Sequence, residues 1–325
     1  MYLTSRETLD GLRREWNDLL RRSHAETVFS SWEWQNAWWQ SFADGAEPYF
    51  ITIRDGSRLL GIVPLVKRDG VLSFAGGMDV SDYLDVIAEE GQEEQVLRAL
   101  LEYLCTVDWD RIELHFLRQD SPTLALLPQL AGERSLAVTQ QTDDVCPFIN
   151  LPQDWDAYLN TLSKKDRHEL RRKIRRLEAQ DLLKWIVVPS DEISETDLDD
   201  FMQLCRQSKQ EKALFMDQRM EEFFRSSVSE VRPLNVVRLY FMEIDGRRVS
   251  AAMCFNHGQE LWLYNSGYDP AYAPLSVGLL LKARCIHDAI ERGKSRFDFL
   301  RGRERYKYDL GGIDAPVVGL TITPR

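Results

Sequence analysis

The stretch Leu261–Lys307, LWLYNSGYDPAYAPLSVGLLLKARCIHDAIERGKSRFDFLRGRERYK, joins a strand, a turn, a helix and a second strand in direct succession. Its opening run of apolar and aromatic residues is typical of a buried strand. Apolar residues at helical spacing follow Pro274 and Ser276 and stop before Gly293, which predicts one long amphipathic helix. The run Phe297–Leu300 then has the composition of another strand.

The start of this predicted helix is a candidate anion site. The first N–H groups of a helix have no carbonyl partner inside it, and the helix dipole adds partial positive charge. Backbone groups at Leu275, Ser276, Val277 and Gly278 would therefore favour a phosphate. Ordinary helix capping by Ser276 and Gly278 explains the same residues without a ligand, so the pattern alone leaves both interpretations open.

Composition excludes several classes of protein. A length of 325 residues fits two ordinary domains or one large one. The net charge of −11 argues against a nucleic-acid coat protein, and we expect no DNA partner. Five scattered cysteines, and five histidines without ligand spacing, predict neither a metal site nor disulfides. No apolar run of membrane-spanning length occurs and the N-terminus is charged, so we expect no membrane span and a cytoplasmic location.

The two halves of the chain repeat one order of elements. Asp55–Gly56 and Asp245–Gly246 each separate two strand-like runs and predict hairpins. In each half, helices precede the hairpin, and a further strand, a helix and a strand follow it. This order indicates a duplicated unit, with a first domain over residues 1–146 and a second over 147–325.

The first half holds two candidate binding features. Four tryptophans within Trp32–Trp39 could form an aromatic wall for a sugar or nucleotide, although packing onto a sheet is the favoured interpretation. Asp82, Tyr83 and Asp85 follow a glycine pair and alternate into an apolar strand. Such residues often line a cleft, where they would bind an acceptor, but a capped turn leading into a strand fits the pattern equally well.

A strongly basic helix is predicted at the start of the second half. Ser163 is a suitable N-cap, and the residues up to Glu178 carry a net charge of +5. Such a helix could grip the phosphates of a donor, a sugar nucleotide or an RNA, whereas most charge runs are solvated faces. Arg167 and Arg171 border its apolar stripe and are the candidates to face a cleft.

Several segments resemble the GNAT-type acyltransferases, and more closely their CelD-like branch, which is associated with cellulose and exopolysaccharide production and related to the Fem-type peptidoglycan aminoacyltransferases. The resemblance extends over most of the chain. Its least specific segments are FSSWEW, GIVPLV and SDYLD. The most specific are the basic helix, NSGYDPAYAPLSVGLLL and FDFLRGRERYKYDLGG.

This resemblance implies a fold class of α/β (α+β), with tandem GNAT-like domains that each hold a mixed, mostly antiparallel sheet flanked by helices. It also implies acyl-CoA, with acetyl-CoA as the expected form, as donor substrate. The donor's pyrophosphate would lie on the helix start at Ser276–Gly278, and unpaired N–H groups at Tyr264 and Asn265, on a splayed strand, would polarise the thioester carbonyl.

Direct attack by the acceptor is the family norm, so the chain must supply a base. Asp298 lies mid-strand, where burial would raise its pKa and suit it to that role. A structural ion pair with Arg301 is the alternative. Arg301 is also a candidate to bind the acceptor. The remaining predicted site residues follow at a bend, where they would assist catalysis or bind the acceptor: Glu304, Tyr306 and Lys307.

Departures from the family pattern leave the donor open. Pro-Leu-Ser-Val-Gly stands where GNAT enzymes carry two glycines after Arg or Gln, so acyl-CoA, acyl carrier protein and aminoacyl-tRNA all fit. The Fem-type coiled-coil insertion is not evident, which disfavours tRNA. We therefore expect acyl transfer to an amine or hydroxyl of a sugar nucleotide, a polysaccharide precursor or a similar small acceptor. The alternatives are a Fem-like aminoacyl-tRNA-dependent transferase and a non-catalytic GNAT-fold binding module.

Overall fold

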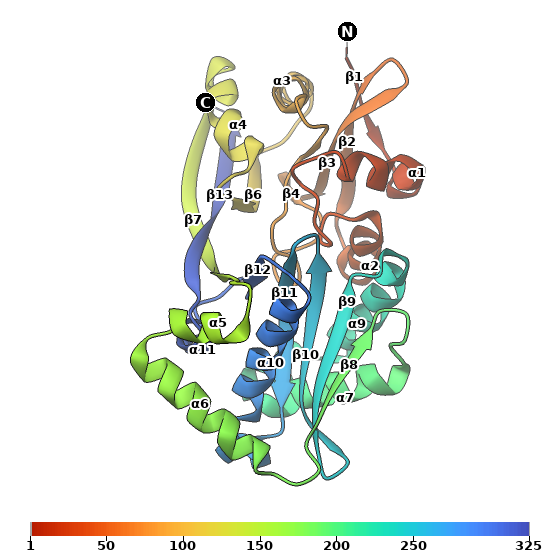
Figure 1. The fold of residues 1–325 in the computed structure, drawn as a ribbon. Coiled ribbons are helices and arrows are strands. Elements are labelled where there is room, and N and C mark those ends of the chain that lie inside the picture. Colours follow the sequence, from red (N-terminus) through yellow and green to blue (C-terminus); the bar gives the residue numbers. More distant parts are fainter. Residues whose placement is uncertain (1, 325) are drawn as a thin grey trace. The chain divides into compact units, whose positions relative to one another are not determined.

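The computed structural model describes residues 2–324 and divides into two compact units (Figure 1). The first unit takes in the chain up to Val145 and again from Pro316, and the second runs from Cys146 to Ala315. Both boundaries fall inside strands, namely β7 (Leu136–Asn150) and β13 (Ile313–Pro324). The second unit therefore ends earlier than the predicted domain 147–325, because the last strand pairs within the first unit.

The first unit contains a sheet in the order β1-β2-β3-β4-β6-β13, in which only β4 and β6 run parallel. The hairpin predicted at Asp55–Gly56 is confirmed, because Asp55 pairs with Arg58. Besides β7 and β13, its elements are β1 (Leu3–Glu7), α1 (Leu9–Leu20), α2 (Trp32–Phe42), β2 (Glu47–Asp55), β3 (Arg58–Arg68), β4 (Val71–Phe74), β5 (Ile87–Ala88), α3 (Glu93–Leu104), β6 (Arg111–Arg118) and α4 (Pro122–Glu133).

The tryptophans of α2 belong to the core of this unit. Trp32, Trp34 and Trp38 are buried, and the indole N–H of Trp34 donates to Ser81 Oγ at 2.9 Å. Ser31 caps the helix by accepting a hydrogen bond from the N–H of Trp34. The favoured interpretation, large side chains packed onto a sheet, is therefore what the structure shows.

The second unit has a sheet in the order β7-β12-β11-β10-β9-β8, in which β11 and β12 run parallel and the other described neighbours run antiparallel. The hairpin at Asp245–Gly246 is confirmed between β9 and β10. Besides the end of β7 and the start of β13, its elements are α5 (Trp155–Thr161), α6 (Lys164–Glu178), β8 (Lys184–Pro189), α7 (Glu195–Ser208), α8 (Gln210–Phe215), α9 (Gln218–Val231), η1 (Arg232–Leu234), β9 (Val237–Ile244), β10 (Arg247–His257), β11 (Glu260–Tyr268), η2 (Pro270–Leu275), α10 (Val277–Glu291), β12 (Arg296–Asp298) and α11 (Arg305–Asp309).

Helices cover both faces of this sheet. The apolar side of α10 packs on one face together with α5 and α6, and Leu261 and Leu263 of β11 point into that core. On the other face, Phe224 of α9 stacks against Tyr264 with ring centroids 5.8 Å apart. Figure 1 shows α10 running along β10 and β11. The long helix predicted from its apolar spacing is thus a central layer of the unit.

The strands β11 and β12 pair over a short length only. Their register ends at Trp262 and Asp298, whereas β11 continues to Tyr268. A register shift between β10 and β11 also leaves Tyr264 as an extra residue, because Met253 pairs with Asn265 and Cys254 with Leu263. The far half of β11 therefore has one edge without a neighbouring strand, next to the start of α10.

Within residues 2–324, no helix combines the length and the apolar character needed to cross a membrane. The five cysteines are free thiols, of which only Cys105 is exposed.

Candidate functional site

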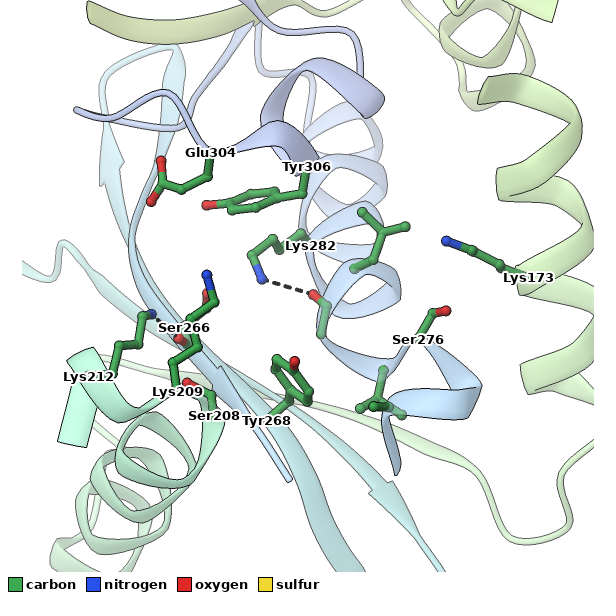
Figure 2. Close-up of a pocket in the computed structure, with 14 residues that line it drawn as sticks. Lys173, Ser208, Lys209, Lys212, Ser266, Tyr268, Ser276, Lys282, Glu304 and Tyr306 are labelled. Atoms are coloured by element: carbon green, nitrogen blue, oxygen red, sulfur yellow. Dashed lines mark hydrogen bonds between the residues drawn. The ribbon is translucent and has the colours of Figure 1, made fainter. Parts of the chain in front are cut away.

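A cavity of about 310 Å³ lies at the unpaired end of β11, and its described lining belongs entirely to the second unit (Figure 2). The start of α10 forms one wall, and α8 and the segment that begins α11 contribute the others. The residues that line it are Lys173, Ser208, Lys209, Lys212, Ser266, Tyr268, Ala273, Ser276, Val277, Gly278, Leu279, Lys282, Glu304 and Tyr306.

The first turn of α10 opens onto this cavity. Ser276 adopts the left-handed conformation, with φ 59°, and its side chain makes no capping hydrogen bond. The first helical hydrogen bond runs from the N–H of Leu280 to Ser276 O at 3.0 Å. The N–H groups of Val277, Gly278 and Leu279 precede that bond and have no acceptor within the helix. Capping by the Ser276 side chain is therefore not observed, and the predicted anion site keeps its backbone donors.

Gly278 allows the helix to approach β11 closely. A Cβ atom built on Gly278 would lie 2.8 Å from the ring of Tyr268, closer than side-chain carbons approach one another. Leu275, the last residue of η2, is half-buried just before this turn. A glycine at position 278 therefore lets the first turn of α10 pack directly against Tyr268 of β11.

Lys212 of α8 lines the cavity and donates hydrogen bonds to β11. Its ammonium donates to Asn265 Oδ1 at 2.8 Å and to the carbonyl of Ser266. Asn265 Oδ1 also accepts the N–H of Ser266 at 2.8 Å, so the exposed edge of β11 is covered by side chains. Burial lowers the pKa of Lys212. Asn265, predicted to polarise a carbonyl through its N–H, here acts through its side chain as an acceptor.

Lys282 lies one turn into α10 and is 8% exposed. Its ammonium donates to the carbonyl of Gly278 at 3.0 Å and lies 4.5 Å from the ring centre of Tyr306 (Figure 2). Burial, reinforced by the charge of Lys212, lowers the pKa of Lys282 to about 7. Sequence reasoning missed this residue, although a lysine inside the apolar run LLLKARC was a signal available to it.

Glu304 and Lys307 form an ion pair at the other wall. Lys307 is 1% exposed, and its ammonium donates to the carbonyls of Leu300, Arg301 and Gly302 at 2.8–3.0 Å. It also lies 2.9 Å from Glu304 Oε2. Burial acts to raise the pKa of Glu304, but the charge and hydrogen bond of Lys307 outweigh it and hold that pKa below its usual range. Glu304 is thus an ionised carboxylate lining the cavity.

Asp298 is completely buried on β12, outside the set of residues that line the cavity. One carboxylate oxygen accepts the N–H of Leu300 at 2.8 Å, and the other lies 3.2 Å from the guanidinium of Arg296. Leu300 has a left-handed φ of 54°, so Asp298 fixes the sharp turn after β12. Tyr306 lines the cavity, and burial raises the pKa of its hydroxyl.

The other predicted residues lie elsewhere. Tyr264 packs its ring against Phe255 with centroids 4.9 Å apart, on the side of the sheet away from α10. Arg167 donates to Asn160 at 3.3 Å, and Arg171 faces Asp156 at 3.7 Å, whereas Lys173 is the residue of α6 that lines the cavity.

Three predicted acceptor-binding residues belong to the first unit. Asp82, Tyr83 and Asp85 are each at most 8% exposed. Burial raises the pKa of Asp85 to about 6, although hydrogen bonds with Ser121 and Thr123 act to lower it.

The charge balance of the cavity favours an anionic ligand. Among the described lining residues, four are lysines and one is a carboxylate. Together with the open amides of α10, these lysines form a positive surface that suits phosphate groups. Within residues 2–324, no cluster of three histidine, cysteine, aspartate or glutamate side chains is placed to hold a metal ion.

Residues 164–308 match the family model of the acetyltransferase (GNAT) domain, and all the described residues that line the cavity fall within this stretch. No curated protein matches the chain. Among solved structures, the chain is similar to FemX, with a TM-score of 0.66 and 10% identity over 98% of this chain and 96% of that one. It is also similar to L-PGS from Bacillus licheniformis, with a TM-score of 0.59 and 10% identity over 96% and 91% of the two chains.

A tandem GNAT protein from the clavulanic acid biosynthesis pathway is similar as well, with a TM-score of 0.53 and 10% identity over 98% of each chain. At these identities the likeness concerns the fold alone. The predicted α/β (α+β) fold class, with GNAT-like neighbours that include tandem proteins, is confirmed.

Proposed function

We propose that this protein is an acyltransferase that transfers an acyl group, with acetyl as the expected one, from acyl-CoA to an amine or hydroxyl. The observation that carries the proposal is the first turn of α10, whose open amides face a lysine-lined cavity within the stretch that matches the GNAT domain model. The sequence resemblance to the CelD-like branch supports a sugar nucleotide or polysaccharide precursor as acceptor.

The residues present fit the phosphates of such a donor. Amides of Val277, Gly278 and Leu279 would bind the pyrophosphate, because they lack acceptors within the helix. Lys173 and Lys209 line the same cavity and would add charge. Bound acyl-CoA would supply an activated thioester, and the chain itself would position the two substrates and manage the proton of the acceptor.

Within this proposal, Glu304 is the carboxylate that faces the acceptor. Lys307 positions it through their ion pair and holds the preceding loop by its three carbonyl contacts. Asp298 positions the same loop from β12 through the N–H of Leu300. The three residues predicted as catalytic thus act as one group, in which Glu304 alone lines the cavity.

The test is binding of acetyl-CoA and free CoA, measured by calorimetry. Ser276→Asp places a carboxylate at the helix start, where its negative charge would repel phosphate. We expect this variant to weaken binding at least about tenfold, while the neutral control Ser276→Asn stays within about threefold of the wild type. Equal affinity of both variants would show that the helix start is not part of the binding site.

A Fem-like aminoacyl-tRNA donor is the second candidate. Two observations favour it, the fold similarity to FemX and the exposed basic residues of α6. It predicts a complex with charged tRNA whose affinity falls steeply as salt is raised, and no binding of CoA. If neither CoA nor charged tRNA binds, the third alternative, a non-catalytic binding module, gains support.

A further inference from the structure

Lys282 is a buried amine without a counter-charge in contact. Its one hydrogen bond goes to the carbonyl of Gly278, and in the described part of the chain no carboxylate oxygen lies within 4 Å of its Nζ. An ammonium ion in such a place loses hydration and gains no ion pair in return. The neutral amine therefore suits the cavity better when no anion is present.

Charged and titratable groups face Lys282 from several elements. Lys212 of α8 opposes a positive charge there, and Glu304 from the opposite wall favours one. The thiols of Cys205 and Cys285 would stabilise the ammonium form of Lys282 only if they were ionised to thiolates. Burial raises the pKa of the Cys205 thiol to about 11, so this thiol is neutral at pH 7. Burial remains the dominant influence, and it lowers the pKa of Lys282 to about 7.

We propose that Lys282 is the acid–base residue of this cavity: near neutral pH its amine is in part unprotonated in the empty site, and it takes up a proton when a phosphate group binds beside it. The binding equilibrium then includes conversion of the amine to ammonium with one proton from solvent. A bound phosphate supplies the counter-charge that the empty cavity lacks, so ligand and proton bind cooperatively. The identity of the natural ligand rests on the proposed function, but the phosphate chemistry does not.

The test is calorimetry with inorganic pyrophosphate and, separately, with CoA, in buffers of different ionisation enthalpy. From the pKa of about 7, binding should take up about 0.5 proton at pH 7 and about 0.9 proton at pH 8. Lys282→Met should still bind, more weakly, and take up none. Lys209→Met is the matched control, since it removes another cavity lysine and should leave the uptake in place.

Each outcome distinguishes the two proposals. Binding without proton uptake, or uptake that survives Lys282→Met, overturns the role of Lys282 and leaves the CoA donor intact. Pyrophosphate binding with uptake, but no CoA binding, removes the CoA donor and supports Lys282. If neither ligand binds, both proposals fail. Should Lys282→Met not fold, NMR titration of the lysine side chains in the wild type decides, because a lysine midpoint near pH 7 is required.

Discussion

The Nζ atom of Lys307 lies 2.9 Å from Oε2 of Glu304, so a fully buried ammonium is joined to a carboxylate that lines the cavity. The same ammonium holds three successive carbonyls of the loop before α11. A side chain expected to meet the acceptor is therefore already saturated with partners from the chain itself.

Replacing Lys307 by Met should lower the free energy of unfolding by about 3–5 kcal/mol, because three loop carbonyls and Glu304 lose a buried donor. Urea unfolding measures this change. Lys209→Met, at an exposed lysine of the same cavity, should stay within about 0.5 kcal/mol. Unchanged stability in Lys307→Met, combined with loss of activity, would instead assign Lys307 a direct catalytic role.

Asp298→Asn should destabilise the protein by about 2–4 kcal/mol, because the guanidinium of Arg296 loses a charged partner that is completely buried. Asp314→Asn is the matched control, since Asp314 pairs with Arg303 at a partly exposed site, and it should change stability by less than about 1 kcal/mol. Equal effects of the two substitutions would contradict a structural role for Asp298.

Lys282→Met should stabilise the protein in a pH-dependent way. The pKa of Lys282 in the folded protein is about 7, below the 10.5 of an exposed lysine. Between these values the unfolded chain binds a proton that the folded protein does not, so the contribution of Lys282 to stability rises with pH. The cost of burial is complete below pH 7 and vanishes above pH 10.5.

We therefore expect the variant to gain about 2–4 kcal/mol at pH 6 and less than about 1 kcal/mol at pH 10, relative to the wild type. Chemical denaturation at the two pH values measures the difference. A gain that is equal at both would show that Lys282 is not held neutral by the fold.

Gly267→Ala should be among the most destabilising single substitutions in β11. A Cβ atom there would lie 2.3 Å from the backbone N of Cys205, where α7 crosses the strand, and backbone cannot rotate away as a side chain can. We expect a loss of at least about 3 kcal/mol. Gly132→Ala in α4 has no atom within 4 Å of the new Cβ and should be neutral or stabilising by up to about 1 kcal/mol. Thermal unfolding of both variants checks the contrast.

Local signals in the sequence were sufficient for some of the elements. The hairpins at Asp55–Gly56 and Asp245–Gly246, and the long helix α10, follow from turn chemistry and apolar spacing, which depend only on near neighbours in the chain. The open amides at Val277–Leu279 likewise belong to any helix start. For that reason a candidate anion site at the helix start could be predicted before any tertiary contact was known.

Burial and partners of charged side chains were decided only by the tertiary structure. Asp298 and Lys307 looked like reactive groups, yet both are held by loop backbone, and Asp298 also by Arg296. Lys282 drew no notice in its apolar helix, although burial lowers its pKa to about 7. The sequence determines which groups can ionise, whereas their pKa values depend on desolvation and neighbouring charge, which arise when distant segments pack together.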